Sequence, residues 1–394
     1  MALTAPPLSL YVHFPWCVSK CPYCDFNSHA LRGELPVAAY LQALLADLDT
    51  QRAFVADRAV TSIFMGGGTP SLFPPSAIAE LLAGIRDRLE LTDEAEVTLE
   101  ANPGTIERGR FADYRQAGIN RVSLGAQSFA AAQLQMLGRI HQADDTRRAV
   151  DELHAAGIAN FNLDLMVALP GQSLAAALED VEVALSLQPL HMSLYQLTLE
   201  PGTLFGARPP AGLPDDDAAA EMHGRCQQRL ETAGFARYEV SAYARAGFHC
   251  RHNMNYWSFG DYLGIGAGAH GKHSSAQGRI VRTTREREPR RYLAGVVRPP
   301  AMITVAAEDL PFEFMMNALR LVDGFEIAHF EQRTGQDWLT VQPAAHRLQQ
   351  RGLLRLSPQH CAVTELGGRF LNDVVSEFLH GHEPNRYQKT LKAL

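Results

Sequence analysis

Three of the six cysteines lie within eight residues of one another near the amino end of the chain, at Cys17, Cys21 and Cys24. A disulfide framework would spread its cysteines through a small secreted chain, so this clustering indicates a metal or redox site instead. Three thiolates in one loop can bind three irons of a [4Fe–4S] cube. The fourth iron then has no protein ligand and is open to a small chelating molecule.

Structural zinc is the alternative for the same loop. Zinc requires four ligands, usually as two separated pairs, and here His13 or His29 would have to complete the set. The Cys-x3-Cys-x2-Cys spacing within one loop is not that of a zinc ribbon. A loop without any metal is the third alternative, and the spacing favours the iron–sulfur cube over both.

Length, composition and charge describe an ordinary globular protein. The 394 residues are 46% hydrophobic and 20% charged, which suits two or three domains of ~150 residues. Lys and Arg number 36 against 43 acidic residues, so binding to nucleic acid through phosphates is not expected. No stretch approaches the ~18 apolar residues of a membrane span. The first sixteen residues carry no Lys or Arg and lack the basic start of a secretory signal, which predicts a soluble, cytoplasmic protein.

The first two hundred residues alternate between predicted strands and helices, which favours a parallel sheet covered by helices. Predicted strands cover Leu8–Phe14, Val60–Met65, Glu96–Glu100, Arg121–Gly125, Asn160–Ala168 and His191–Leu199. Predicted helices cover Pro36–Val55, 76–89 with Ser76 as a cap, 105–117, 131–156 with a break near Gly138, and 173–187.

The remainder of the chain has a different character. Prolines and acidic residues over 209–217 indicate a linker, before a helix at 218–233, a strand at Arg237–Ala244 and a Gly- and aromatic-rich loop at 247–273. The last ninety residues predict two or three helices, a hairpin of Leu353–Leu356 with Cys361–Thr364, and a final helix at 367–379. This is a winged-helix-like plan, although 9 basic against 11 acidic residues from 301 on argue against DNA reading. The predicted domains are 1–207, 208–300 and 301–394.

Polar residues follow or interrupt the predicted strands where a barrel of this type carries its active site, at the carboxyl ends of the strands. Gly66–Pro70 ends the second strand, Glu100 ends the third and Gln127 follows the fourth. Asp164 lies inside an apolar strand, where a carboxylate is costly unless it is paired or bound to a ligand. Arg139 could pair with it. Each residue alone could be a satisfied core or edge group, but four at one edge favour a site.

The cysteine loop, with the aromatic Tyr23 before its third cysteine, resembles the radical S-adenosylmethionine superfamily. The resemblance implies an α/β fold, a partial (β/α)6 barrel, here followed by a small C-terminal winged-helix-like α+β domain. It also implies a [4Fe–4S] cluster held by Cys17, Cys21 and Cys24, whose open iron binds the amino and carboxylate groups of S-adenosylmethionine.

Further motifs are similar to the oxygen-independent coproporphyrinogen III oxidase group of that superfamily. They are Tyr11-x-His13-x-Pro15-x-Cys17, Gly-Gly-Gly-Thr-Pro, Glu100-Ala-Asn-Pro, Leu124-Gly-Ala-Gln127-Ser and Asp164-Leu-Met-x-x-Leu-Pro-Gly-Gln. The resemblance implies that S-adenosylmethionine is bound by Tyr11, Tyr23, Gly67, Gly68, Thr69 and Glu100, with Gln127, Arg139 and Asp164 at positions that contact a second molecule.

Two differences separate the chain from the oxidase. Phe26 stands where the oxidase has a further cysteine, and only sixteen residues precede Cys17. The chain looks closer to the heme chaperone (HemW) subfamily, whose His-Asn-x-x-Tyr-Trp signature matches 252–257. That resemblance makes His252, Cys250, Tyr256 and Trp257 candidate heme-binding residues. A neutral imidazole suits heme iron, and aromatic faces suit a macrocycle. The same segment could instead close the open edge of the barrel.

Two functions follow, with a non-redox structural role as a third. The first is a heme chaperone that carries heme as cargo and delivers it to acceptor hemoproteins, which could include membrane-bound respiratory proteins. The alternative is a radical S-adenosylmethionine oxidoreductase acting on a porphyrinogen, as oxygen-independent coproporphyrinogen III dehydrogenase; Phe26 argues against that activity. The sequence leaves open whether the chain forms a homodimer. The run Arg282–Arg291 could meet heme propionates or an acidic acceptor, although a solvated face is favoured. Cys226 and Cys361 are expected to be buried structural thiols.

Overall fold

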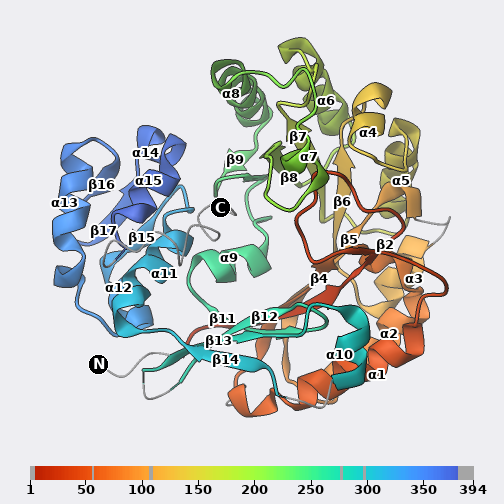
Figure 1. Ribbon diagram of the computed structural model, residues 1–394, viewed down its shortest axis with the longest axis horizontal. Helices are drawn as coiled ribbons and strands as arrows, with labels where there is room; N and C mark the ends of the chain where they lie inside the picture. Colours follow the sequence, from red (N-terminus) through yellow and green to blue (C-terminus); the bar gives the residue numbers. More distant parts are fainter. Residues whose placement is uncertain (1–4, 56, 106–109, 276–277, 296–298, 380–394) are drawn as a thin grey trace.

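The computed structural model of the chain describes residues 5–55, 57–105, 110–275, 278–295 and 299–379. One twelve-stranded sheet dominates it, with a second, smaller α+β layer at the carboxyl end (Figure 1). Among the described helices, none combines the length and the apolar character needed to cross a membrane.

Six parallel strands form the centre of the large sheet, in the order in which they occur along the chain. They are β1 (Leu8–Phe14), β4 (Val60–Gly67), β5 (Leu91–Ala101), β6 (Arg121–Gln127), β7 (Phe161–Val167) and β8 (His191–Gln196). The helices between them are α1 (Val37–Asp49), α2 (Pro75–Arg86), α3 (Arg110–Ala117), α4 (Ala131–Met136), α5 (Ala143–Ala155) and α6 (Leu174–Ser186). The predicted α/β fold with a six-stranded partial barrel is confirmed.

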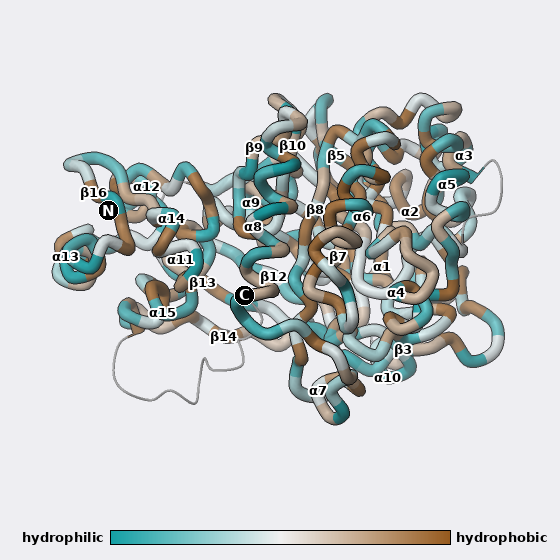
Figure 2. Tube along the Cα trace, turned by 90° about the horizontal axis from the view of Figure 1, so that it is seen from above, coloured by the Kyte–Doolittle hydropathy of each residue, from teal (hydrophilic) through white to brown (hydrophobic). Residues whose placement is uncertain are grey.

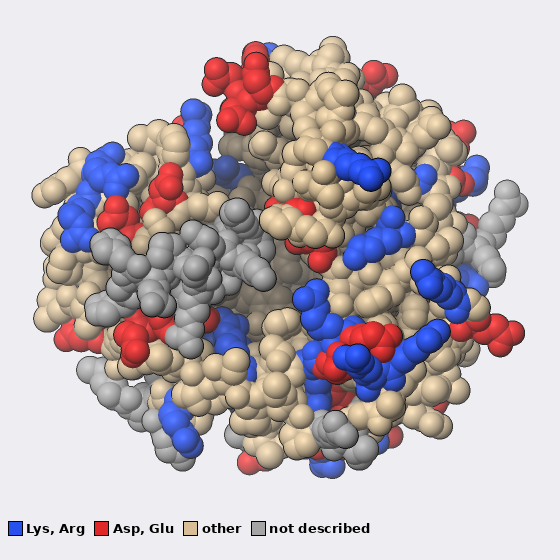
Figure 3. All heavy atoms as spheres, viewed as in Figure 1, with Lys and Arg blue, Asp and Glu red and all other residues tan. Residues whose placement is uncertain are grey.

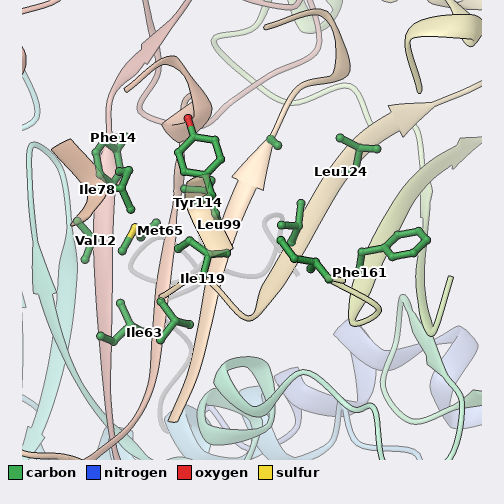
Figure 4. Packing of buried hydrophobic residues seen from close by; sticks show 14 of the residues in the cluster. Val12, Phe14, Ile63, Met65, Ile78, Leu99, Tyr114, Ile119, Leu124 and Phe161 are labelled. Atoms are coloured by element: carbon green, nitrogen blue, oxygen red, sulfur yellow. The ribbon is translucent and has the colours of Figure 1, made fainter. Parts of the chain in front are cut away.

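The strands alternate between two environments because successive side chains point to opposite faces of a sheet. Leu8, Leu10, Val12 and Phe14 of β1 are fully buried and face the covering helices. Figure 4 shows Val12, Phe14, Ile63 and Met65 packed with Ile78 and Tyr114 from α2 and α3, and Figure 2 shows hydrophobic residues concentrated along the central strands. The opposite face of the sheet lines the interior of the barrel, where the polar residues lie.

The interpretation of 247–273 as a loop is wrong. This segment contains α9 (Arg251–Trp257), β11 (Asp261–Ile265), which pairs in parallel with β1, and β12 (His270–Ser274). With β13 (Ile280–Thr284) and β14 (Ala301–Thr304) these strands extend the sheet beyond β1. The glycines permit close strand pairing: a Cβ on Gly264 would lie 1.8 Å from the carbonyl oxygen of His270.

Several predicted boundaries also move. Ser76 is not the cap of α2, since the helix begins at Pro75, a favoured first position. The predicted strand 237–244 is a hairpin of β9 (Ala236–Arg237) and β10 (Ala242–Ala244). The helix predicted from 36 to 55 ends at Asp49, and that at 105–117 starts at Arg110, with 106–109 outside the described residues. The break near Gly138 is confirmed.

The remaining elements of this part of the chain are β2 (Trp16–Cys17), β3 (His29–Ala30), α7 (Leu204–Ala207), α8 (Asp216–Thr232), α10 (Pro289–Gly295), and 3-10 turns at Arg52–Phe54, Pro70–Leu72 and Pro103–Thr105.

The carboxyl-terminal part has the helices and the small sheet of the winged-helix-like plan predicted for it. Its sheet, in the order β15 (Phe325–Glu326), β17 (His360–Val363) and β16 (Leu354–Leu356), packs with helices around a separate hydrophobic cluster. The helices are α11 (Leu310–Ala318), α12 (Ile327–Thr334), α13 (Gln342–Gln350), α14 (Glu365–Arg369) and α15 (Leu371–Ser376), with 3-10 turns at Ala307–Asp309 and Trp338–Thr340. The single final helix predicted at 367–379 is therefore two short ones. The division at 207 and 300 stays a prediction.

Part of the run Arg282–Arg291 is not a solvated face. Arg282 on β13 forms an ion pair with Glu313 of α11, and buried Arg285 forms one with Asp47 of α1. These two arginines join the strand extension to its neighbours and are therefore not available to heme propionates. Arg287, Arg290 and Arg291 are exposed as expected. Cys226 and Cys361 are buried, as predicted.

Candidate functional site

A cavity of about 370 Å³ opens at the carboxyl ends of the central strands. Most of the residues singled out from the sequence line it: Cys17, Cys21, Tyr23, Cys24, Gly67, Gly68, Thr69, Glu100, Gln127, Arg139 and Asp164. Tyr11 is not among its lining residues; its hydroxyl shares a 2.9 Å hydrogen bond with His13 Nδ1, and its ring packs near Phe64 and His252. The fold thus brings residues from four central strands, β4 to β7, together with residues of the cysteine loop and of the segments after β4 and α4, to a single cavity.

The cysteine loop is closed at its base by backbone pairing of β2 with β3. Within the loop, Lys20 Nζ donates hydrogen bonds of 3.2 and 3.1 Å to the carbonyl oxygens of Phe26 and Ser28. Asn27 Nδ2 donates 2.9 Å bonds to the carbonyl oxygens of Ala267 and Arg287, which fixes the loop to the strand extension. The loop is therefore held in place by contacts from distant parts of the chain.

The donor set of this loop fits an iron–sulfur cube better than a single metal ion. Within the described residues, no three or more His, Cys, Asp or Glu side chains converge on a point where one ion could sit. A cube accepts thiolates that bind separate irons around one cavity, whereas zinc needs all four ligands around one point. His13 is engaged at both ring nitrogens, by Tyr11 and by the Asn27 carbonyl. His29 has a buried Nε2 without a hydrogen-bond partner among the described residues.

All three thiols are partly buried, and for two of them this burial opposes ionisation. Burial raises the pKa of the Cys17 thiol, and a hydrogen bond with Thr69 partly offsets this rise. Burial likewise raises the pKa of the Cys24 thiol, and a hydrogen bond with Ser28 acts in the opposite direction. Metal ligands must be thiolates, so loading this loop with metal releases protons and is favoured by higher pH.

Arg139 does not pair with Asp164, contrary to the expectation from the sequence. Its Nη1 lies 3.7 Å from Cys21 Sγ and its Nη2 donates a 2.7 Å hydrogen bond to the carbonyl oxygen of Gly125. The backbone explains this position: Gly138 has φ +67°, and a Cβ there would lie 2.9 Å from Pro22 Cδ. The end of α4 therefore packs directly on the cysteine loop and directs a guanidinium at one of its sulfurs.

A polar network on the cavity floor was missed from the sequence. Asn162 is at the centre of this network. Its Nδ2 donates hydrogen bonds to Ser123 Oγ at 2.8 Å and to Asp164 Oδ1 at 2.7 Å. Its Oδ1 contacts His191 Nδ1 at 2.7 Å and Ser193 Oγ at 3.1 Å. Residues 162 and 164 lie directly beside 191 and 193 in the β7–β8 register. The signal in the sequence was the alternation of polar and apolar residues along β6, β7 and β8, which marks one polar face.

Glu100 and Asp164 are the carboxylates of this floor. Glu100 Oε2 accepts a 3.0 Å hydrogen bond from the backbone N–H of Gly67. Burial, and then the nearby Asp164, raise the pKa of Glu100 to about 7. Burial also raises the pKa of Asp164, although Asn162 and Ser193 favour its ionised form. Near neutral pH, Glu100 can therefore hold or release a proton at the edge of the cavity.

We expect a Glu100→Gln variant, compared without bound cofactors, to gain stability relative to the wild type as pH rises from about 4.5 to 7. The folded state binds the Glu100 proton more tightly than the unfolded chain does, so the wild type loses stability through this window. The difference should be on the order of 2 kcal/mol, measured by urea unfolding at pH 5 and pH 8. A difference in unfolding free energy that does not change with pH would contradict the assigned proton.

Backbone conformation shapes the strand ends around the cavity. Gly67 has φ +109°, and a Cβ there would lie 2.3 Å from the His13 ring. Gln127, at the end of the fourth parallel strand, has φ +67°, which costs about 1–3 kcal/mol for a residue with a side chain. The following turn is held by Asp180, whose carboxylate accepts bonds from Ser128 Oγ at 2.8 Å and Phe129 N at 2.6 Å. The strain at Gln127 is thus sustained by a buried anchor.

The four heme-binding candidates lie together on and before α9, which contacts β1, β4 and β11 inside the barrel and α11 on its other side (Figure 1). His252 is 1% exposed; its Nδ1 lies 3.1 Å from Ser62 Oγ and its Nε2 2.9 Å from Tyr256 OH. Burial lowers the pKa of His252 to about 3, so its ring is neutral. Cys250 is also buried, 3.5 Å from Glu96 Oε1. The Arg320 guanidinium lies 4.3 Å over the Trp257 ring.

Comparisons with known proteins agree along nearly the whole chain. Residues 11–184 match the family model of the radical SAM superfamily, and residues 305–370 match that of the HemN C-terminal domain. The heme chaperone HemW of Escherichia coli is 50% identical over 95% of this chain and 98% of its own length. HemW of Haemophilus influenzae is 47% identical with the same coverage.

Other matches extend the comparison. The mouse mitochondrial radical S-adenosyl methionine domain-containing protein 1 is 42% identical over 67% of this chain and 60% of that protein. Among solved structures, coproporphyrinogen III oxidase (HemN) from Escherichia coli aligns with a TM-score of 0.80 over 95% of this chain and 90% of that chain. At 21% identity this likeness shows a shared fold alone.

Proposed function

This chain belongs to the HemW family within the radical SAM superfamily, and on that premise we propose that it is a heme chaperone that binds heme and passes it to acceptor hemoproteins. The observation that carries the proposal is 50% identity with a protein named for that role, over 95% of this chain. Phe26 supports it, because the position offers no further thiol beside the three that line the cavity.

We further propose that the chain holds a [4Fe–4S] cluster on Cys17, Cys21 and Cys24 and binds S-adenosylmethionine beside it. When bound, such a cluster supplies an open iron for chelation and a centre for one-electron transfer. The chain's own residues prepare the place: Arg139 directs positive charge at Cys21 Sγ, and Glu100 orients the backbone of Gly67 at the adjoining strand end. The cavity is lined further by Gln127, Thr69 and Tyr23, with Asp164 on its floor.

An enzyme acting on a porphyrinogen is the second candidate. The observation in its favour is the cavity floor, where burial and the nearby Asp164 raise the pKa of Glu100 to about 7, so that Glu100 can hold or release a proton near neutral pH. Anaerobic incubation of the reduced, reconstituted protein with coproporphyrinogen III and S-adenosylmethionine distinguishes the two. Formation of protoporphyrinogen would favour the enzyme, whereas heme binding followed by release to an apo-hemoprotein supports the chaperone.

We expect His252→Ala to weaken heme binding by about tenfold or more, since an imidazole is a common axial ligand of heme iron. The measurement is a heme titration followed by Soret absorbance, as a difference spectrum against the same heme-free protein. His346→Ala, a substitution at an exposed histidine on α13, is the matched control and should bind like the wild type. Equal loss in both variants would contradict a specific role of His252.

Delivery itself requires a separate measurement. Heme-loaded protein is mixed with an apo-hemoprotein, and the spectrum of the acceptor is followed after the two are separated. Heme that binds but never leaves would overturn the chaperone proposal. Membrane-bound acceptors, a homodimer and a cytoplasmic location are further predictions that acceptor screening, light scattering and cell fractionation would test.

A further inference from the structure

The buried position of His252 raises the question of where heme first contacts the protein. Both ring nitrogens are engaged, by Ser62 and Tyr256, and the side chain is almost completely covered. A macrocycle cannot reach this imidazole without movement of α9. If the chain is a heme chaperone, as proposed above, an accessible first contact must lie elsewhere.

The mouth of the cavity carries large apolar side chains in water. Phe26 of the cysteine loop is 62% exposed and Tyr195 at the end of β8 is 44% exposed, and both line the cavity. Val18, Ile140, Leu199 and Leu204, which belong to the cysteine loop or follow α4 and β8, are exposed as well. Single exposed apolar residues are ordinary, but two large ones on the lining of one cavity, with others exposed on adjoining segments, indicate a surface that binds an apolar partner.

Two cations lie against the same short segment of the loop. Lys20 Nζ is 3.2 Å from the carbonyl oxygen of Phe26, and Arg287 Nε is 3.5 Å from Asn27 Oδ1. Both side chains are exposed, and within the described part of the chain neither forms an ion pair. Asp25 of the same loop lines the cavity. Figure 3 shows Lys and Arg side chains gathered next to the hollow at the centre of the molecule, interspersed with acidic ones.

We propose that this cavity mouth is the first docking site of heme, with the macrocycle lying against Phe26 and its two propionates paired with Lys20 and Arg287. The chemistry selects the ligand: the exposed aromatic needs an apolar ring, and the two cations, which have no ion-pair partner among the described residues, need carboxylates on the ring edge. A purely apolar ligand would leave both cations with only their hydrogen bonds to the loop and no ion-pair partner, and a simple anion would leave Phe26 uncovered. Transfer to His252 is a later step that requires α9 to move.

The test compares heme with heme dimethyl ester, which has the same ring but no carboxylates, on reconstituted full-length protein. We expect the wild type to bind heme about tenfold more tightly than the ester, as two partly solvated ion pairs would provide. The double variant Lys20→Ala with Arg287→Ala should bind heme about as weakly as the ester and bind the ester unchanged. Phe26→Ala should weaken the binding of heme and the binding of the ester about equally.

The controls separate a local effect from a general one. Arg225→Ala removes an exposed cation on α8 and Phe370→Ala an exposed aromatic next to α15; both should bind like the wild type. Because Lys20 also supports the loop, Lys20→Arg with Arg287→Lys keeps both charges and should restore the preference for heme over the ester.

The outcomes distinguish this inference from the proposed function. A wild type that binds no heme would overturn the chaperone proposal itself. A wild type that binds heme and its ester equally, or a charge-removing double variant that keeps the preference, would overturn the docking site while leaving heme binding in place.

Discussion

A Cys17→Ser variant, reconstituted anaerobically with iron and sulfide, is expected to hold almost no iron–sulfur cluster. Cys17, Cys21 and Cys24 are the thiols that line the cavity, so loss of one leaves a second iron of the cube without a protein ligand. A serine hydroxyl is a poor substitute for a soft thiolate. The measurement is iron and acid-labile sulfide per chain, together with paramagnetic resonance of the reduced protein.

The control for this loss is a thiol outside the loop. Cys361→Ala removes a buried cysteine of the carboxyl-terminal part, far along the chain from the cavity, and should retain the wild-type cluster content. Zinc in anaerobically purified wild-type protein, with no iron signal, would contradict the cluster assignment. A Cys17→Ser variant with full iron content would contradict the role of this particular thiol.

An Asp47→Ala variant is expected to lose about 3–5 kcal/mol of unfolding free energy, because it leaves a buried arginine without its counter-charge. Asp47 lies on α1 and is fully buried, where it forms an ion pair with Arg285. Its carboxylate also accepts hydrogen bonds from Tyr292 OH at 2.8 Å, Gly266 N at 3.1 Å and Gln51 Nε2 at 2.9 Å. One side chain thus joins α1 to the strand extension and α10.

The same helix provides the matched control. Asp49, two residues further on, is 44% exposed and pairs with Arg88 at 3.0 Å, so Asp49→Ala should cost less than about 1 kcal/mol. Urea unfolding of the cofactor-free proteins measures both changes. Equal losses of unfolding free energy at the two positions would show that the buried Asp47 network stabilises the fold no more than an exposed ion pair does.

The chemistry of the site is predictable from the sequence because its ligands are local. Three cysteines within eight residues must share a loop in any fold, so their spacing alone indicates a multi-iron centre. The alternation of strands and helices predicts the parallel sheet, and parallel strands place their carboxyl ends at one edge. For that reason the amino-acid sequence alone places Glu100, Gln127 and Asp164 near the cysteines.

Partners far apart in the sequence are not predictable in the same way. Arg139 contacts Cys21 and not Asp164, because the packing of Gly138 on Pro22 determines where its side chain points. Arg285 forms an ion pair with Asp47 and is not part of a solvated face, because β11 to β13 fold back beside α1. The segment 247–273 resembles a loop in its composition because its glycines, needed for close strand pairing, are also the residues of flexible turns.

The amino-acid sequence by itself determined the α/β class, the thiol loop and the identity of the residues at the strand ends, since these follow from local spacing and periodicity. Only the tertiary structure decided which of those side chains meet, which charges are paired and that His252 is enclosed by Ser62 and Tyr256. The physical reason is that burial and ion pairing depend on contacts between segments as far as 260 residues apart, and no local pattern encodes them.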